Sequence, residues 1–364
     1  MRKIEVKPGT RVYDVIIGGG SLRHAGREIR RVLPQRDSRV FVITSPRVRA
    51  HWGEALEHSL RSAKLSYHVL EMDDGEPAKK LATVELLAEQ MVNASADRKS
   101  VVVAFGGGVV GDSAGFLAAM FMRGIPVVQI PTTLLAQVDA SIGGKTGVNL
   151  RAGKNLIGAF HQPLAVLVDP EVLRTLDERE FRSGLFEALK CGVIRDNKLF
   201  SFMESNAGNI LKWDRDALAS IIRAAIEVKA QVVSKDERES GLRRILNYGH
   251  TVGHAIEAAT GYSRLLHGEA VAWGMIAAAE IARDVRVCSA KTTERIKAAI
   301  MAYGPLPPIA AKTDEIVSRL AADKKTISGN LHFVLPEKIG KVKIVSNVPN
   351  EVIYRSIGAI TNHG

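Results

Sequence analysis

An alternation of strands and helices runs through the first half of the chain and constrains the fold more than any other feature. Its clearest segment is residues 100–105, SVVVAF, which is almost wholly apolar and is followed at once by Gly106-Gly107-Gly108. A short, uninterrupted apolar strand is typical of a parallel sheet that is buried on both faces. The segment therefore predicts a layered α/β domain, in which ligands bind at the carboxyl ends of the strands.

Beyond about residue 180 the Val-Ile runs give way to Ala, Glu, Lys and Arg, and helical periodicity dominates. A chain of 364 residues exceeds one ordinary core. We therefore expect a mainly parallel, Rossmann-like α/β domain over residues 1–180 and a mostly α-helical domain over 181–364. The predicted strands are 12–17, 40–44, 66–71, 100–105 and 125–130, the predicted helices are 22–32, 47–62, 79–93, 181–194, 216–233, 249–259, 269–284 and 292–301, and a hairpin is predicted over 331–335 and 341–345.

The composition excludes some classes of protein. The net charge is +11, but the basic residues are spread thinly and aromatics make up 5%, which argues against a nucleic-acid surface and suits steering of a small anion. No apolar run reaches the roughly 20 residues that span a bilayer. The N-terminus lacks a signal core, and Cys191 and Cys288 are too few for a disulfide framework. We expect a cytoplasmic protein without membrane or nucleic-acid partners.

Three of the ten histidines fall within eighteen residues: His250, His254 and His267. The first two are four apart and share one face of a helix, and His267 opens a second apolar helix after a Gly-Tyr-Ser break. Clustered histidines favour a metal or catalytic site over separate packed side chains. Thr251 stands where a protease H-E-x-x-H motif needs glutamate. Two ligand sets remain open, either three histidines or two histidines with a carboxylate.

Two glycine-rich segments suggest anion binding. Gly106 to Asp112 satisfies G-x-G-x-x-G between a strand and a helix, although such turns also serve packing, and no acidic residue ends a second strand about 20 residues later. A nucleotide would therefore bind in a variant mode. The segment from Asp139 through Gly-Gly-Lys-Thr to Asn155 is not a P-loop, because Asp139 replaces its first glycine. Its Lys and Asn side chains favour an anion pocket over a solvated loop.

Several long strings together resemble one family. GGGVVGDSAGF, RGIPVVQIPTTLLAQVDASIGGKTGVN, GKNLIGAFHQP, LNYGHTVGHAIE and LHGEAVAWGM occur in unbroken order between about residues 70 and 340. They are similar to the 3-dehydroquinate synthases of the sugar phosphate cyclase superfamily. The resemblance implies an N-terminal NAD-binding domain, a helical C-terminal domain that binds metal and substrate, a divalent metal (zinc or cobalt) between them, and a homodimer.

The resemblance also implies a reaction. The family converts 3-deoxy-D-arabino-heptulosonate 7-phosphate to 3-dehydroquinate and phosphate in the shikimate route to aromatic amino acids. A ring hydroxyl is oxidised by NAD, phosphate is eliminated, the ketone is reduced, the ring opens and an aldol step closes the carbocycle. NAD is regenerated within each turnover.

The matching positions imply roles for individual residues. The implied metal ligands are Glu187, His250 and His267. The implied catalytic residues are His254 as an acid/base group, Glu239 as proton acceptor, Lys145 and Arg243. The implied substrate contacts are Arg123, Asp139, Lys145, Asn155, Lys190, Lys229, Arg243, Asn247 and one of the adjacent lysines Lys324 and Lys325, of which we assign Lys324. The implied NAD contacts are Asp74, Glu76, Lys79, Gly107, Gly108, Asp112, Thr132, Thr133, Lys154 and Thr175.

Three positions depart from the family pattern. Asp73 replaces a proline and Ala78 a tyrosine in the segment around Glu76, and Ser45 stands where the family usually has Asp or Asn. Ser45 lies at the adenosine end of the implied cofactor site and predicts weaker NAD binding, and all three changes concern cofactor affinity rather than the reacting centre.

Three other functions compete with this interpretation. One is a cyclase that makes 2-epi-5-epi-valiolone or 2-deoxy-scyllo-inosose from a substrate without a carboxylate, against which Arg243, Asn247 and residues 323–325 argue. A metal-dependent polyol dehydrogenase would release NADH and would not need the Lys and Asn cluster. A nucleic-acid binder would leave the histidines and the glycine loop unexplained.

Overall fold

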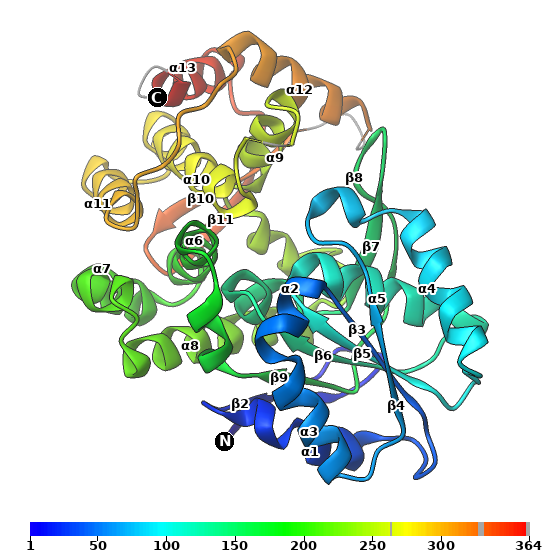
Figure 1. Cartoon of the computed structure of the whole chain (residues 1–364). Helices are drawn as coiled ribbons and strands as arrows, with labels where there is room; N and C mark the ends of the chain where they lie inside the picture. Colours follow the sequence, from blue (N-terminus) through cyan, green and yellow to red (C-terminus); the bar gives the residue numbers. More distant parts are fainter. Residues whose placement is uncertain (263, 327–330, 362–364) are drawn as a thin grey trace. The chain divides into compact units, whose positions relative to one another are not determined.

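A seven-stranded sheet forms the centre of the first half of the chain in the computed structural model (Figure 1). The structure describes residues 1–262, 264–326 and 331–361, except for the side chains of 322–326. The strand order is β1-β2-β9-β6-β5-β3-β4, and all neighbouring strands are parallel except β1 and β2. The central strands are buried along their whole length, as their apolar sequences predict. The strands are β1 (Arg2–Val6), β2 (Tyr13–Ile17), β3 (Val40–Thr44), β4 (Tyr67–Glu71), β5 (Val101–Gly106), β6 (Val127–Pro131) and β9 (Ala165–Val168).

Both faces of the sheet are covered, so alternate side chains of one strand enter two different cores. Val101 and Val103 of β5 pack with α1 (Ala25–Val32) and α3 (Glu54–Ser62). Val102 and Ala104 pack with α4 (Leu81–Asn93) and α5 (Gly108–Met120). Burying each valine contributes roughly 1.5–3 kcal/mol. This two-sided burial explains why the strand has no polar face.

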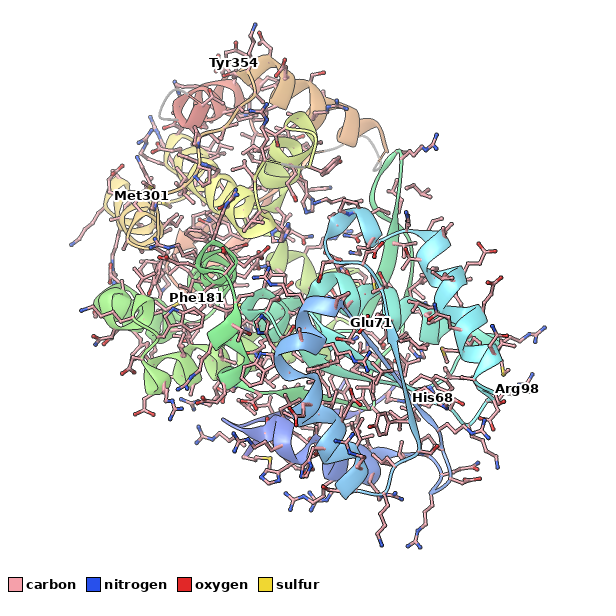
Figure 2. The ribbon with its side chains drawn as sticks, viewed as in Figure 1. His68, Glu71, Arg98, Phe181, Met301 and Tyr354 are labelled. Carbon is pink, nitrogen blue, oxygen red and sulfur yellow. The ribbon has the colours of Figure 1, made fainter. Side chains whose placement is uncertain are left out.

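The edge strand β4 is less buried and carries polar side chains (Figure 2). The ring of His68 stacks on Phe41 with centroids 5.4 Å apart. Glu71 accepts a hydrogen bond from Arg49 Nη1 at 3.0 Å. Arg49 begins a π-helical segment, Arg49–Gly53, which joins the short α2 (Pro46–Val48) to α3. These polar contacts suit a strand that has a partner on one side only.

A long hairpin, β7 (Lys145–Leu150) with β8 (Gly153–Phe160), occupies the segment where the sequence suggests an anion-binding loop. The pairing runs from Lys145 opposite Phe160 to Leu150 opposite Gly153. Gly147 and Gly158 meet backbone to backbone, because a Cβ at Gly158 would lie 2.2 Å from the Thr146 carbonyl oxygen. The sequence does not predict these two strands, because glycine and lysine are poor local strand formers and the pairing of the strands supplies the stability.

The second half of the chain is largely helical, with one two-stranded sheet. The helix α10 is at its centre, since it packs against α6, α9, α11 and α13 and is buried from Gly268 to Ala282. The elements are α6 (Glu178–Ile194), α7 (Asn197–Leu211), α8 (Arg215–Lys235), α9 (His250–Ala259), α10 (His267–Asp284), α11 (Ala290–Met301), α12 (Thr313–Thr326), α13 (Asn350–Thr361), β10 (His332–Lys338) and β11 (Lys341–Ser346).

The chain divides into two compact units, Met1–Asp177 with Lys229–Arg238, and Glu178–Val228 with Glu239–Gly364. The predicted fold class, a mainly parallel α/β region followed by a largely helical one, is confirmed. The exact domain limits, 1–180 and 181–364, stay a prediction. Within the described residues, no helix is both long and apolar enough to cross a membrane.

Candidate functional site

Two successive helices bring the three clustered histidines together. His250 is the first residue of α9 and His267 is the first residue of α10. The ring centroid of His250 lies 5.3 Å from that of His254 and 5.2 Å from that of His267, and the centroids of His254 and His267 are 5.9 Å apart. Gly249 precedes α9 at φ +80, a left-handed conformation that glycine adopts without strain. The predicted cluster is therefore formed.

Glycines allow α9 and α10 to approach backbone to backbone. A Cβ at Gly274 would lie 1.9 Å from the Gly249 carbonyl oxygen, and one at Gly253 would lie 3.0 Å from the Ala270 carbonyl oxygen. At the start of α10, a Cβ at Gly268 would lie 2.0 Å from the Ser183 carbonyl oxygen on α6. This close approach places the starts of α9 and α10 next to the buried face of α6.

Glu187 on α6 supplies a carboxylate to the histidines. Its Oε1 lies 3.8 Å from His250 Nε2 and 3.7 Å from His267 Nε2, and the side chain is fully buried. Lys190 Nζ lies 2.5 Å from the other oxygen, yet neither carboxylate oxygen accepts a well-oriented hydrogen bond from the residues that the structure describes. Two imidazoles and a carboxylate are a donor set that zinc prefers, so the residues fit a metal.

Hydrogen bonds at the other ring nitrogens orient both imidazoles. His250 Nδ1 lies 3.2 Å from the Tyr248 carbonyl oxygen, and His267 Nδ1 lies 3.3 Å from Glu257 Oε2. Both partners are acceptors, so each Nδ1 carries a proton, and in the neutral imidazole each Nε2 offers a lone pair on the side of Glu187. Burial by itself lowers the pKa of His267, but the hydrogen bond to Glu257 and the charges of Glu257 and Glu187 raise it above the ordinary value.

Glu257 is not among the site residues that the sequence predicts. The side chain is 2% exposed although it is ionisable, and it lies seven residues after His250 and three after His254, on the same face of α9. This spacing is the feature of the sequence from which Glu257 can be predicted. An acidic residue on an apolar helix face next to two histidines predicts a partner for an imidazole.

Two groups of described residues bring possible metal-ligand atoms within 4.8 Å of one another. One is Glu187, His250 and His267, and the other is His254, Glu257 and His267. His254 is exposed. The three histidines alone do not form such a group among the described residues, so the geometry favours a set that includes a carboxylate.

The residues implied for NAD follow the carboxyl ends of parallel strands in the first unit. Asp74, Glu76 and Lys79 follow β4, residues 107–112 follow β5, Thr132 and Thr133 follow β6, and Thr175 ends the 3-10 helix Pro170–Thr175 after β9. Lys154 lies on β8. The departing residue Ser45 follows β3. Open parallel sheets bind ligands at this edge, and the residues therefore fit a nucleotide.

The glycines at this edge also serve packing. A Cβ at Gly107 would lie 2.9 Å from Thr133 Cγ2, whereas one at Gly108 would meet no described atom nearer than 3.5 Å. The helix α5 begins at Gly108, so the backbone N–H groups of its first turn are not covered by a side chain at that position. Packing explains Gly107, and Gly108 leaves room for an anion.

Lys79 is a buried member of the implied NAD residues and makes two side-chain hydrogen bonds. It is 4% exposed, and its Nζ donates to Asp112 Oδ2 at 2.6 Å and to Asn155 Oδ1 at 2.5 Å. Desolvation raises the pKa of Asp112, against the opposing effect of Lys79. Thr175 accepts a hydrogen bond from Trp52 Nε1 at 2.8 Å, a partner that the sequence did not suggest.

The implied substrate residues form pairs within each unit. In the first unit, Lys229 Nζ donates to Asp139 Oδ1 and to the Asp139 carbonyl oxygen, both at 2.6 Å. In the second, Asn247 Nδ2 donates to Glu239 Oε1 at 2.6 Å. Of the others, Arg243 and Lys190 are buried, Arg123 and Lys145 are exposed, and the side chain of Lys324 lies outside the described residues.

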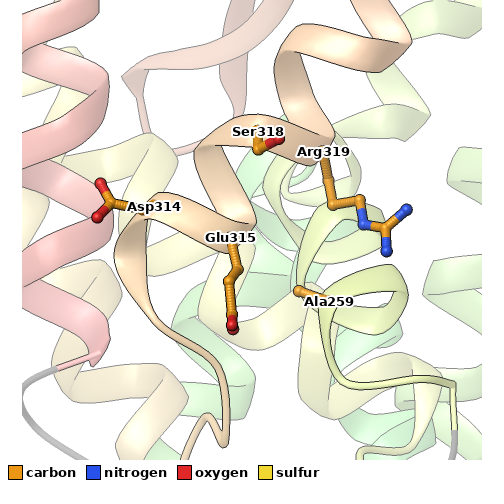
Figure 3. A pocket seen from close by; sticks show the side chains of 5 residues that line it. All are labelled: Ala259, Asp314, Glu315, Ser318 and Arg319. Carbon is orange, nitrogen blue, oxygen red and sulfur yellow. The ribbon is translucent and has the colours of Figure 1, made fainter.

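A hollow of about 440 Å³ lies between the end of α9 and α12 in the second unit (Figure 3). Ala259, Asp314, Glu315, Ser318 and Arg319 line it. None of the predicted site residues is among them, so this hollow is separate from the candidate metal centre.

Comparison with known proteins agrees with the geometry. Residues 69–183 match the family 3-dehydroquinate synthase N-terminal, and residues 184–326 match 3-dehydroquinate synthase C-terminal. The chain is 52% identical to 3-dehydroquinate synthase of Koribacter versatilis (strain Ellin345) over 357 residues, 98% of this chain and 97% of that one.

Two solved structures share the fold. A 2-epi-5-epi-valiolone synthase from Streptomyces hygroscopicus with NAD+ and Zn2+ bound has a TM-score of 0.89 and 30% identity, over 97% of both chains. A 2-deoxy-scyllo-inosose synthase with carbaglucose-6-phosphate, NAD+ and Co2+ has a TM-score of 0.88 and 28% identity, over 98% of this chain and 99% of that one. The chain therefore belongs to the 3-dehydroquinate synthase family of phosphate-eliminating sugar phosphate cyclases.

Proposed function

We propose that this chain converts 3-deoxy-D-arabino-heptulosonate 7-phosphate to 3-dehydroquinate and phosphate, with NAD used and regenerated within each turnover. The observation that carries the proposal is the buried Glu187 carboxylate facing Nε2 of His250 and His267. The 52% identity to a 3-dehydroquinate synthase supports this member of the superfamily over the cyclases that are about 30% identical.

The three ligand residues hold one divalent metal, for which we propose zinc, with cobalt as the alternative. Held by Glu187, His250 and His267, the metal would supply a Lewis acid that polarises the hydroxyl to be oxidised. Glu257 and the Tyr248 carbonyl keep the two imidazoles in the tautomer that offers Nε2.

His254 acts as the acid/base group beside the ligands. Its exposed imidazole lies 5.3 Å from the ring of His250, so it can meet a substrate without leaving the cluster. Glu239 accepts a proton elsewhere on the substrate, and the hydrogen bond from Asn247 fixes its carboxylate.

The substrate carries a carboxylate and a phosphate, so its contacts must be cations and amide donors. Arg243, Arg123 and Lys145 supply positive charge, whereas the Lys190 ammonium pairs with Glu187 and contacts the substrate as a hydrogen-bond donor. The Lys229 ammonium is paired with Asp139. We therefore propose that this pair orients the hydroxyl groups of the substrate and does not neutralise the substrate's negative charge. Lys324 completes the proposed set, which also includes Asn155 and Asn247.

NAD binds at the carboxyl edge of the parallel sheet, where it supplies the hydride acceptor. The proposed contacts are Asp74, Glu76, Lys79, Gly107, Gly108, Asp112, Thr132, Thr133, Lys154 and Thr175. Ser45 stands at the adenosine end and gives this chain weaker cofactor binding than the usual family residue, and Asp73 and Ala78 also depart from the family pattern near Glu76. We also propose that the chain is a homodimer.

The decisive experiment measures phosphate release by the purified chain from 3-deoxy-D-arabino-heptulosonate 7-phosphate, with catalytic NAD and zinc and with NADH absorbance followed in parallel. We expect phosphate equal to the substrate consumed, without net NADH. Release of phosphate from sedoheptulose 7-phosphate instead would indicate a 2-epi-5-epi-valiolone synthase. Accumulation of NADH without phosphate release would indicate a dehydrogenase.

A further inference from the structure

Asn149 occupies a junction between residues of two different proposed sites. It lies near the end of β7, on the hairpin that also carries Asn155. Its Nδ2 donates to Glu76 Oε1 at 2.7 Å, and its Oδ1 accepts the backbone N–H of Asn155 at 2.9 Å. Its own backbone N–H donates to the Lys79 carbonyl oxygen at 2.8 Å. One side chain and its peptide unit therefore contact Glu76 and Lys79 on one segment and Asn155 on another.

Lys79 makes a second, direct link between the same segments. Its ammonium donates to Asp112 and to Asn155 Oδ1 at once. An ammonium offers donors only, so the amide oxygen of Asn155 must face it. The amide N–H groups of Asn155 are then the part of the side chain that can face an anion, which suits the phosphate of a sugar phosphate.

The backbone of Asn155 needs support in this position. Its φ is +56, in the left-handed region that asparagine tolerates better than most residues. The acceptor from Asn149 and the ammonium of Lys79 hold the backbone and the side chain of Asn155, respectively. Without the Asn149 side chain, the backbone N–H of Asn155 loses its partner and the turn of the hairpin is less restrained.

We propose that Asn149 is a positioning residue that couples NAD binding to sugar phosphate binding. The inference rests on the proposed function, which assigns Glu76 and Lys79 to NAD and Asn155 to the substrate. NAD that orders the segment around Glu76 then also orders Asn155. A sugar phosphate that orders Asn155 likewise orders the segment around Glu76, because coupling between two sites is reciprocal. Asn149 acts through its neighbours and has no assigned contact with either ligand.

The test measures the dissociation constant of NAD by calorimetry on the full, zinc-loaded chain, with and without saturating inorganic phosphate. We expect phosphate to tighten NAD binding about fivefold or more in the unaltered chain, the lower end of typical coupling, and less than about twofold in Asn149→Ala. The reciprocal titration, phosphate with and without NAD, must give the same factor.

Two further variants separate positioning from general loosening of the hairpin. Leu150→Ala alters the neighbouring exposed side chain and should leave the coupling factor unchanged. Asn149→Asp places a carboxylate against the Glu76 carboxylate and should abolish the coupling. In the double variant Asn149→Asp with Glu76→Gln, the glutamine amide can donate to the aspartate, so the hydrogen bond returns in the reverse direction and the coupling should recover. Thermal unfolding of each variant checks that the chain is folded.

The outcomes distinguish this inference from the proposed function. Two results would overturn only the role of Asn149. One is equal coupling in Asn149→Ala and the unaltered chain, and the other is no coupling in an unaltered chain that binds both ligands. Failure of the unaltered chain to bind NAD or phosphate overturns the assignments on which the inference rests.

Discussion

A different feature of the fold positions each ligand residue of the candidate metal centre. Glu187 is buried because α6 is apolar around it, and His250 and His267 occupy the first positions of two helices. Removing any one leaves two ligand atoms, which is too few for tight zinc binding.

We expect His267→Ala to abolish metal retention and His254→Ala to keep the metal while slowing turnover. The reason is that His267 belongs to both possible ligand groups, whereas His254 belongs only to the one without Glu187. Metal content of the dialysed proteins is the measurement. Normal metal in His267→Ala would remove it from the ligand set, and metal loss in His254→Ala would favour the group with Glu257.

Glu257→Gln should weaken zinc binding by about 10- to 100-fold, because loss of a carboxylate behind a ligating histidine has this typical effect. Glutamine keeps an oxygen that can accept from His267 Nδ1 but removes the charge. Competition with a zinc chelator measures the affinity. Glu280→Gln is the matched control, since Glu280 is also buried in the second unit but pairs with Lys297, and equal losses in the two variants would contradict the orienting role.

At the scale of elements, the approach of α9 to α10 holds the histidines together. Contact between helix backbones at Gly249, Gly253 and Gly274 replaces the interlocking of side chains that separates most helix pairs by about 8–10 Å. The site geometry therefore depends on positions that carry no chemistry of their own.

Gly274→Ala should lower the free energy of unfolding by about 3 kcal/mol, because its Cβ would overlap a carbonyl oxygen and force α10 away from α9. The affinity for zinc should fall together with the free energy of unfolding. Gly208→Ala on α7 has no neighbour within 4 Å and should stabilise the chain by roughly 0.5–1 kcal/mol. Denaturant unfolding measures both, and similar effects in the two variants would show that the helix contact is not critical.

At the scale of the whole molecule, metal binding should stabilise the folded chain. A ligand that binds the native state alone contributes about 2.7 kcal/mol at a concentration one hundred times its dissociation constant. We expect zinc to raise the unfolding temperature of chelated protein by several degrees in calorimetry and to leave His267→Ala unchanged. An equal rise in that variant would place the stabilising zinc elsewhere.

Much of the fold follows from local sequence. The strands β3, β5 and β6 and the starts of α9 and α10 were predicted within two residues, because unbroken apolar runs and helical periodicity are local signals. The family and its activity, which the long motifs predicted, are confirmed by the comparisons. The individual site roles stay predictions.

Other features depend on residues far apart in the chain. The edge strand β1 and the hairpin β7–β8 lack a strong local signal, and each forms because a partner strand completes its hydrogen bonds. The partners of Lys79 are 33 and 76 residues away. No spacing rule connects positions so distant.

The layered α/β architecture, the family and the chemical types of the candidate ligands can be predicted from the sequence alone, since they depend on burial periodicity and residue identity. The three-dimensional fold is needed to bring Glu187 to His250 and His267, to place Glu257 behind His267 and to bring Asn149 into contact with both Glu76 and Asn155. Those contacts are set by how helices and strands pack, and packing is a property of the whole fold.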